Sequence, residues 1–224
     1  MKKLEGLPRE MIALRASKEL KDGDYVNLGI GIPTLISNWI EGRDIFLQAE
    51  IGMTKTGPLA YGNDVDQDLI NASCQAVVGL PGSAYFDIVE SFGMIRGGYM
   101  NVICMGALQV NGRGDYAGWN NPARGLGNVG DIGGSMDLCA GANKLIILME
   151  HTTRDGQPKI VEELSYPATA KGKVNMVVTS LGVFEVTPQG MVLKEIYPGL
   201  TVEQVQSVTE PKLTIAPDLK EIEL

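Results

Sequence analysis

The sequence predicts an α/β fold with a parallel or mixed β-sheet, in one domain of ordinary size or two small ones. With 224 residues, 44% hydrophobic and 21% charged, the chain can bury a sizeable core. Residues 101–110 form an apolar run typical of a strand covered on both faces, as in parallel or mixed sheets. Residues 25–40 read as strand, glycine turn and helix. Because no internal repeat or linker divides the chain, we expect one domain over residues 1–224.

The first elements are a helix over residues 8–22, followed by a strand over residues 25–28. Apolar residues recur at helical spacing in the helix, Pro8 suits its first turn, and Gly23 suits its end. The glycine turn 29–33 follows the strand, and residues 34–40 can begin a second helix. Such a turn can present backbone N–H groups to an anion, although a tight structural turn explains it as well.

A short apolar strand over residues 44–49 ends at Glu50, and Gly52 and then Gly57-Pro58 are expected to break regular structure. Ala49 and Ile51 flank the carboxylate with little to solvate its charge. A partly dehydrated carboxylate is more basic and more nucleophilic. The alternative is that Glu50 is an ordinary solvated acid at the end of a strand.

The middle of the chain is harder to interpret. Residues 62–67 are polar and acidic, and no element can be assigned over residues 69–80. Ser83 can cap a helix that Gly97-Gly98 ends, and core packing suffices to explain its apolar residues. The buried strand 101–110 follows.

The segment 111–134 is the longest irregular stretch and is rich in glycine. Loops of this length inside a domain are usually functional or disordered. It ends in Gly133 and Gly134, before a short helix and a strand over residues 144–149. Consecutive glycines before a helix can aim two N–H donors at one oxyanion, or they can form a plain turn.

The last part of the chain predicts two strands, a hairpin and a final helix. Residues 174–180 and 183–187 are strands, and the latter turns back into residues 191–196. Thr201 and Gln204 form a capping box for a helix that ends near Val208. We expect an extended tail from Pro211.

Charge and composition exclude several classes of function. The formal charge of -8, without a basic patch in the sequence, argues against nucleic acid and anionic membranes as partners. No apolar run reaches membrane-spanning length. Cys74, Cys104 and Cys139 lie far apart in apolar surroundings, which predicts reduced, buried thiols in a cytoplasmic protein.

The remaining chemistry is that of a carboxylate. His151 is the one histidine, and no serine or cysteine is marked as its nucleophilic partner. The spacing of the cysteines argues against zinc, so we expect no metal, and no phosphate loop of the NTPase type is present. A carboxylate on a turn, together with two glycine loops that can donate N–H groups, favours acyl transfer.

Several motifs, taken in order, resemble one known family, the β subunits of family I coenzyme A transferases. The resemblance covers about residues 10–210, and its nearest members are the 3-oxoacid and the acetate or butyrate-acetoacetate transferases. The motifs are V-N-L-G-I-G-I-P-T-L from Val26, A-E-I-G-M from Ala49, G-A-L-Q-V from Gly106, G-G-S-M-D-L from Gly133 and M-E-H from Met149.

The resemblance implies a Rossmann-like α/β fold with a mixed, largely parallel sheet flanked by helices. It places Glu50 at the catalytic glutamate and Gly133 and Gly134 at the oxyanion glycines. It also assigns coenzyme A (CoA) binding to four residues of the other motifs, namely Asn27, Gly29, Gly31 and Gln109. It implies no metal and no permanently bound cofactor, because CoA is a substrate.

The resemblance further implies a partner α subunit, in a heterodimer or an α2β2 assembly. CoA would move from an acyl-CoA to a short-chain carboxylic acid by a ping-pong mechanism through a covalent glutamyl-CoA thioester. This chain has Ala49 and Ile51 where the family more often has Ser and Asn, and Gly118-Trp119 where it has N-W. Two alternatives stay open at this point, a CoA-binding regulatory subunit without catalysis and a sugar-phosphate isomerase of related fold.

Overall fold

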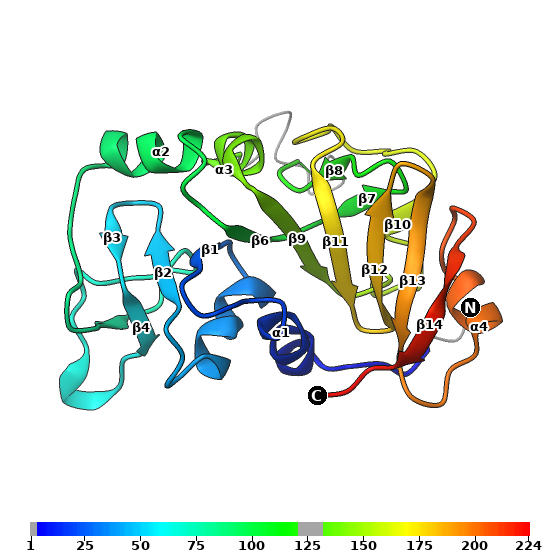
Figure 1. Cartoon of the computed structure of the whole chain (residues 1–224), viewed down its shortest axis with the longest axis horizontal. Helices are drawn as coiled ribbons and strands as arrows, with labels where there is room; N and C mark the ends of the chain where they lie inside the picture. Colours follow the sequence, from blue (N-terminus) through cyan, green and yellow to red (C-terminus); the bar gives the residue numbers. More distant parts are fainter. Residues whose placement is uncertain (1–3, 121–131) are drawn as a thin grey trace.

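The computed structural model describes residues 4–120 and 132–224 and is built around one nine-stranded sheet. The strand order is β14-β13-β12-β11-β9-β6-β1-β2-β3 (Figure 1). Five adjacent strands at its centre are parallel to one another: β1 (Tyr25–Leu28), β2 (Phe46–Ala49), β6 (Val102–Gly106), β9 (Lys144–Met149) and β11 (Val174–Thr179). The α/β class with a mixed, largely parallel sheet is therefore confirmed.

The outer strands make the sheet mixed. At one edge, β12 (Gly182–Thr187) and β13 (Gly190–Ile196) form the antiparallel hairpin that the sequence predicts. The tail expected to be extended is β14 (Thr214–Glu221), which pairs in parallel with β13. At the other edge, β3 (Met53–Thr54) is antiparallel to β2.

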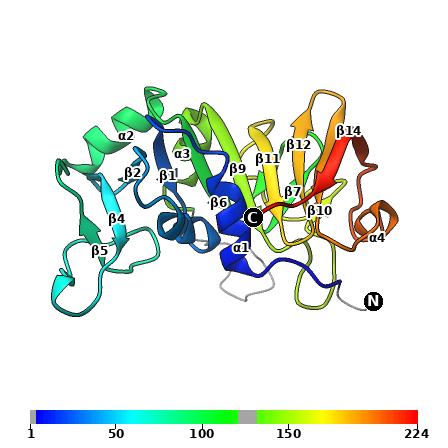
Figure 2. The same ribbon diagram turned by 60° about the horizontal axis from the view of Figure 1, so that its bottom comes forward.

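Helices cover both faces of the sheet, as the apolar runs require (Figures 1 and 2). The strand β9 divides its side chains between the two resulting cores: Leu145 and Ile147 belong to one, and Ile146 and Leu148 to the other. The first core contains residues of α2 (Ile88–Arg96) and α3 (Ser135–Gly141). The second contains residues of α1 (Arg9–Ser17) and of the 3-10 helix η1 (Ile32–Trp39).

Two small sheets accompany the large one. The first has the order β10-β7-β8 and comprises β7 (Gln109–Asn111), β8 (Tyr116–Ala117) and β10 (Ile160–Val161). The second pairs β4 (Thr56–Leu59) with β5 (Val77–Gly79), and the 3-10 turn η2 (Gly62–Asp64) lies between them in the chain. The second sheet lies beside β2 and β3 (Figure 1), at the end of the molecule opposite β14 (Figure 2).

Several predictions of element boundaries were wrong, each for a local reason. The run 101–110 is two strands rather than one, because the chain leaves the large sheet at Gly106 and joins the small one at Gln109. Both strands are buried, so the apolar pattern continues although the pairing partners change. Gly57-Pro58 lies inside β4 instead of breaking it, since the pairing with β5 is irregular there and an irregular edge tolerates proline.

The helix predicted after Ser83 begins later, because Asp87 caps it. The Asp87 carboxylate accepts hydrogen bonds from the N–H groups of Val89 and Glu90, at 2.8 and 2.9 Å. The Ser83 hydroxyl instead donates to a nearby carbonyl, that of Leu80. Core packing explains only the later part of this helix, because Ile95 is buried in the core whereas Ile88 and Val89 are exposed.

Other predictions of local structure were confirmed. Both β1 and β9 have the predicted bounds, and Thr201 and Gln204 form the capping box of α4 (Val202–Gln206). The first helix starts after Pro8 as predicted but ends at Ser17, earlier than expected. Within the described ranges, no helix is long and apolar enough to cross a membrane.

Candidate functional site

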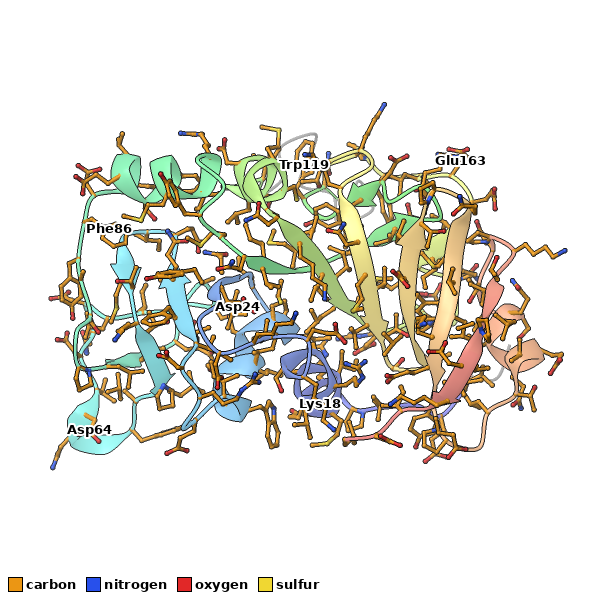
Figure 3. The ribbon with its side chains drawn as sticks, viewed as in Figure 1. Lys18, Asp24, Asp64, Phe86, Trp119 and Glu163 are labelled. Carbon is orange, nitrogen blue, oxygen red and sulfur yellow. The ribbon has the colours of Figure 1, made fainter. Side chains whose placement is uncertain are left out.

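The side chain of Glu50 lies at the carboxyl end of β2, on a tight turn. The Gly52 N–H donates to the Ala49 carbonyl at 3.0 Å, and Gly52 has a φ of +139°, which an L side chain rarely adopts. A methyl group on Gly52 would also collide with the carbonyl oxygen of Phe86. Figure 3 shows Phe86 beside β3, where the chain approaches α2. The Glu50 turn is therefore fixed by a glycine that has no room for a side chain.

A buried row of polar side chains holds the Glu50 carboxylate by hydrogen bonds. Asn27 on β1 donates from Nδ2 to the Glu50 Oε2 at 3.3 Å and to the Gln48 carbonyl at 3.2 Å. Gln48 in turn donates from Nε2 to the Ser91 hydroxyl of α2 at 3.0 Å. Asn27, Gln48 and Ser91 are all buried, and the Asn27 Oδ1 has no partner among the described residues. Because buried amides keep their hydrogen bonds, this row holds one carboxylate oxygen in place.

The prediction that Glu50 has apolar, water-poor surroundings is correct for Ala49 but not for Ile51. Ala49 is buried, but Ile51 is 58% exposed and Glu50 itself is half-buried. Ala49 and Ile51 both line a groove of about 260 Å³ that runs past the turn toward Tyr85. Its walls are mainly apolar, and Asp68 is the carboxylate among its lining residues.

The glycine turn after β1 has its own hydrogen bonds. The Gly29 N–H donates to the Cys104 carbonyl at 2.8 Å, and the Gly31 N–H donates to the Ser73 hydroxyl at 3.1 Å. Gly31 has a φ of +92°, so the turn needs a glycine at this position. An anion at this turn would have to displace Ser73 from Gly31.

Gly133 and Gly134 lie immediately before α3. Gly133 has a φ of +47°, whereas Gly134 is the N-cap residue of α3 with a φ of -87°. No hydrogen bond within the described residues uses the N–H group of either glycine. A methyl group on Gly134 would collide with the Phe92 ring of α2. Ser91 and Phe92 are consecutive residues of α2. This helix therefore contacts both Gly134 and the polar row that holds the Glu50 carboxylate.

Gln109 lies apart from these groups, in the small sheet. Its side-chain oxygen accepts hydrogen bonds from the N–H groups of Ser165 and Tyr166, at 2.9 and 3.3 Å, and its amide donates to the Ser165 hydroxyl at 2.9 Å. The structure therefore brings Asn27 to Glu50 but shows no such contact for Gln109. The described contacts of Gln109 hold the segment 165–166 against β7.

Histidine and cysteine chemistry has no support in the described residues. His151 is buried with its ring nitrogens against the hydroxyls of Thr179 and Thr209, each at 2.9 Å, and burial lowers its pKa to about 3. Cys104 and Cys139 are buried, and burial raises the pKa of each thiol to about 12. The expectation of a buried Cys74 was wrong, because this residue is exposed on a turn with a φ of +57°.

Two groups of polar residues were not predicted from the sequence. Gln48 and Ser91 support Asn27, and the signal was an amide inside the apolar strand F-L-Q-A. Arg9, Arg154 and Lys159 line one pocket, and nothing in the sequence relates Arg9 to the other two. Residues 121–131 of the predicted functional loop lie outside the described residues.

Comparison with known proteins identifies related chains. The family model described as coenzyme A transferase matches residues 9–207. The B subunit of succinyl-CoA:3-ketoacid coenzyme A transferase from Helicobacter pylori is 41% identical over 207 residues, 92% of this chain and 99% of that one. The B subunit of 3-oxoadipate CoA-transferase from Pseudomonas putida is 39% identical over 203 residues, 91% of this chain and 94% of that one.

A solved structure has the same fold. The thioester complex of an acyl-CoA transferase from Escherichia coli O157:H7 with CoA superposes with a TM-score of 0.74 at 23% identity. The match covers 100% of this chain and 44% of that longer chain. At this identity the likeness establishes the fold and nothing further.

Proposed function

The chain belongs to the coenzyme A transferase family, and from that premise we propose that it is the B subunit of an enzyme that moves CoA between an acyl-CoA and a free short-chain carboxylic acid. The observation that carries this proposal is the position of Glu50. Glu50 directly follows the strand β2, and Asn27 holds one oxygen of its carboxylate. Its two neighbours in the sequence, Ala49 and Ile51, line an apolar groove. Such a carboxylate is placed to act as a nucleophile.

Glu50 is proposed to react by double displacement. A Glu50 oxygen attacks the acyl-CoA carbonyl carbon, and the C–S bond breaks. CoA leaves as the thiolate, and an acyl-glutamyl anhydride remains on the enzyme. The thiolate then attacks the glutamyl carbonyl and releases the first carboxylate, which leaves a glutamyl-CoA thioester. An incoming carboxylate reverses both steps, so no net proton, ATP or redox equivalent is consumed. Each tetrahedral intermediate carries an oxyanion that needs hydrogen-bond donors.

The oxyanion donors are proposed to be the N–H groups of Gly133 and Gly134. Neither group is used within the described residues, which supports a role toward a ligand. The Asn27 amide is proposed to keep the Glu50 carboxylate aligned for attack, since productive geometry must be held closely. Because Gly29 and Gly31 already donate to Cys104 and Ser73, they are proposed to shape the site through their backbone path.

A short apolar acyl group is the substrate class that the groove beside Glu50 supports. Its walls include the side chains of Ile51 and Tyr85, and its volume of about 260 Å³ suits a small chain. Asp68 would repel a second carboxylate on the substrate. A monocarboxylate is therefore favoured over a dicarboxylate on the part of the site that this chain supplies.

The partner is proposed to be an A subunit, because the relatives from Helicobacter pylori and Pseudomonas putida are both named as B subunits. Exposed apolar side chains near the Glu50 turn support a covering partner, among them Ile51, Tyr85 and Val89. A heterodimer or an α2β2 assembly would bury them.

The test is mass spectrometry of the assembled complex after incubation with an acyl-CoA and no acceptor. A peptide containing Glu50 should gain the mass of CoA minus water. The Glu50→Gln complex serves as the control and should gain nothing. A wild-type complex that exchanges CoA but forms no adduct at Glu50 would refute the proposed nucleophile.

A further inference from the structure

A second pocket, away from the groove at Glu50, lies at the carboxyl ends of β6 and β9. It has a volume of about 390 Å³, and Gly31, Gly106 and Glu150 are among its lining residues. Three of its lining side chains are cationic, Arg9, Arg154 and Lys159, and we call it the basic pocket. They come from the start of α1 and from the segment after β9, so the fold brings together residues that are remote in sequence.

Charge in the basic pocket is opposite to that of the whole chain. The chain has a formal charge of -8, but this pocket contains three cations against the single carboxylate of Glu150. Arg9 pairs with Glu150, with Nε to Oε1 at 3.0 Å. Within residues 4–120 and 132–224, the side chains of Arg154 and Lys159 form no hydrogen bond and no salt bridge, although Glu150 attracts the ammonium group of Lys159. The three cations outnumber the one carboxylate of the pocket, so the pocket can bind an anion from outside the chain.

Two backbone hydrogen bonds fix the position of Lys159 in the basic pocket. Its N–H donates to the His151 carbonyl at 3.2 Å, and its carbonyl accepts from the Val110 N–H at 3.0 Å. Burial lowers the pKa of Lys159 to about 8, with Glu150 acting in the opposite direction and Arg9 in the same one. A bound anion would favour the charged form of this lysine.

The basic pocket lies on the same edge of the sheet as Glu50. The strands β2, β1, β6 and β9 are adjacent and parallel, so their carboxyl ends meet at one edge, where open α/β sheets bind ligands. Neighbouring strands are about 4.8 Å apart, so β9 ends roughly 14 Å from β2. Gly31 lines the pocket and follows β1, the strand that carries Asn27.

We propose that the basic pocket binds phosphate groups of CoA, with Arg154 and Lys159 as the anion ligands and Arg9 in support. This inference rests on the proposed function, which makes CoA the substrate. CoA carries a diphosphate and a 3′-phosphate at the far end of a long arm from its thiol. The ligand must therefore be multiply anionic at a distance from the reacting sulfur. A single substrate carboxylate would meet the same cations too far from Glu50 to react.

The test compares acyl-CoA with the same acyl group on pantetheine, which lacks the phosphates. In the assembled complex, Arg154→Gln and Lys159→Gln should each raise the KM for acyl-CoA by about tenfold, because each removes a hydrogen bond to a charged group. The kcat and the KM for the carboxylic acid should stay within about twofold. Rates with acyl-pantetheine should not change, since no phosphate is present.

Lys171→Gln is the matched control, because Lys171 is exposed and outside the pocket. It removes the same charge and should leave every constant unchanged. An unchanged KM for acyl-CoA in the Arg154 and Lys159 variants would overturn the proposal, as would an equal loss with acyl-pantetheine. Circular dichroism and melting of each complex would detect variants that fail to fold.

Binding of adenosine 3′,5′-bisphosphate separates this inference from the proposed function. Calorimetric titration of the complex with this thiol-free fragment needs no catalysis. Binding that is lost in the Arg154→Gln/Lys159→Gln double variant would support the pocket even if no CoA exchange occurred. Exchange in the wild type without any binding difference between wild type and double variant would reject the pocket and leave the proposed function standing.

Discussion

The two ends of the large sheet differ in how completely they bury their own apolar residues. At the end formed by β11 to β14, the strands are long, and Phe184, Met191 and Leu193 are fully buried. At the end that carries Glu50, the strands are short. Large apolar side chains are exposed there, such as Tyr85 and Val89. The first end buries most of its large apolar side chains within the chain, although Ile215 on β14 is exposed. The second end leaves an apolar surface of the kind that partner proteins cover.

This difference separates stability from function within one chain. A buried residue at the β11–β14 end should matter for folding and little for chemistry. A residue at the Glu50 end should matter for chemistry or association and little for folding.

The largest effect is expected from Glu50→Gln. This change removes the proposed nucleophile but keeps the volume of a half-buried side chain, so exchange should fall by at least about 10⁴-fold with an unchanged melting temperature. The measurement is the initial rate of CoA exchange by the assembled complex. Slow deamidation of Gln back to Glu must first be excluded by mass spectrometry. A near-normal initial rate would show that Glu50 is not the nucleophile.

Phe184→Ala should act in the opposite way, on stability alone. Phe184 on β12 is fully buried, and its ring centroid lies 5.5 Å from that of His151. Truncation should cost about 3 to 5 kcal/mol of unfolding free energy, measured by denaturant titration, while the folded fraction keeps its turnover. Val89→Ala is the comparison at the other end, since Val89 is 74% exposed and should cost less than about 0.5 kcal/mol in the isolated chain. Equal destabilisation by both changes would abolish the contrast.

Gly134→Ala tests the oxyanion donors. Gly134 has a negative φ, so backbone strain is not expected, but its new methyl group would collide with the Phe92 ring. Alanine keeps the backbone N–H, but its methyl group should keep the substrate oxygen away from this donor. Loss of one such donor costs about 2.7 to 4 kcal/mol in the transition state, which is a hundredfold to a thousandfold in turnover. Gly134→Ala/Phe92→Leu is the control, because the smaller side chain removes the collision. Turnover that returns with Phe92→Leu would assign the effect to packing instead of to the lost donor.

The smallest effect is a pH dependence from Lys159. Its pKa of about 8 means that the lysine loses its charge as the pH rises through that value, with Glu150, Arg9 and Arg154 as the charged neighbours lining the pocket. If the basic pocket binds phosphate, the KM for acyl-CoA should be constant below pH 7 and rise above pH 8. One pH unit above the pKa the rise would be about tenfold at most. In the Lys159→Gln variant the rise of the KM above pH 8 should disappear. If the rise persists, a group other than Lys159 causes it and the prediction is wrong.

Local patterns predicted much of the fold because they depend on neighbours in the sequence. The bounds of β1 and β9, the antiparallel hairpin and the capping box at Thr201 all follow from such patterns. The split of residues 101–110 could not be predicted, because both resulting strands are equally apolar. Proline inside β4 was also missed, since only the three-dimensional pairing reveals an irregular edge.

The place of Glu50 at the end of a strand was predictable from the sequence, but the side chains that hold its carboxylate were not. The carboxylate stands out at the end of an apolar strand, and the motifs around it resemble a known family. Its contacts join residues that are far apart in the sequence, with separations of 23 residues for Asn27 and Glu50 and 43 for Gln48 and Ser91. No local pattern relates such pairs. The same reason hid the basic pocket, where Arg9 meets residues more than a hundred positions later.

The exposure of Cys74 has a practical consequence for studying this chain. Cys104 and Cys139 are shielded, and their thiols stay protonated at neutral pH, so a maleimide reagent should modify the protein at Cys74 without any cysteine replacement. The neighbouring Ser73 accepts a hydrogen bond from the Gly31 N–H, so a fluorophore attached there would sit beside the turn that lines the basic pocket. The native sequence thus carries a single-site reporter position, suited to following ligand binding by a change in emission.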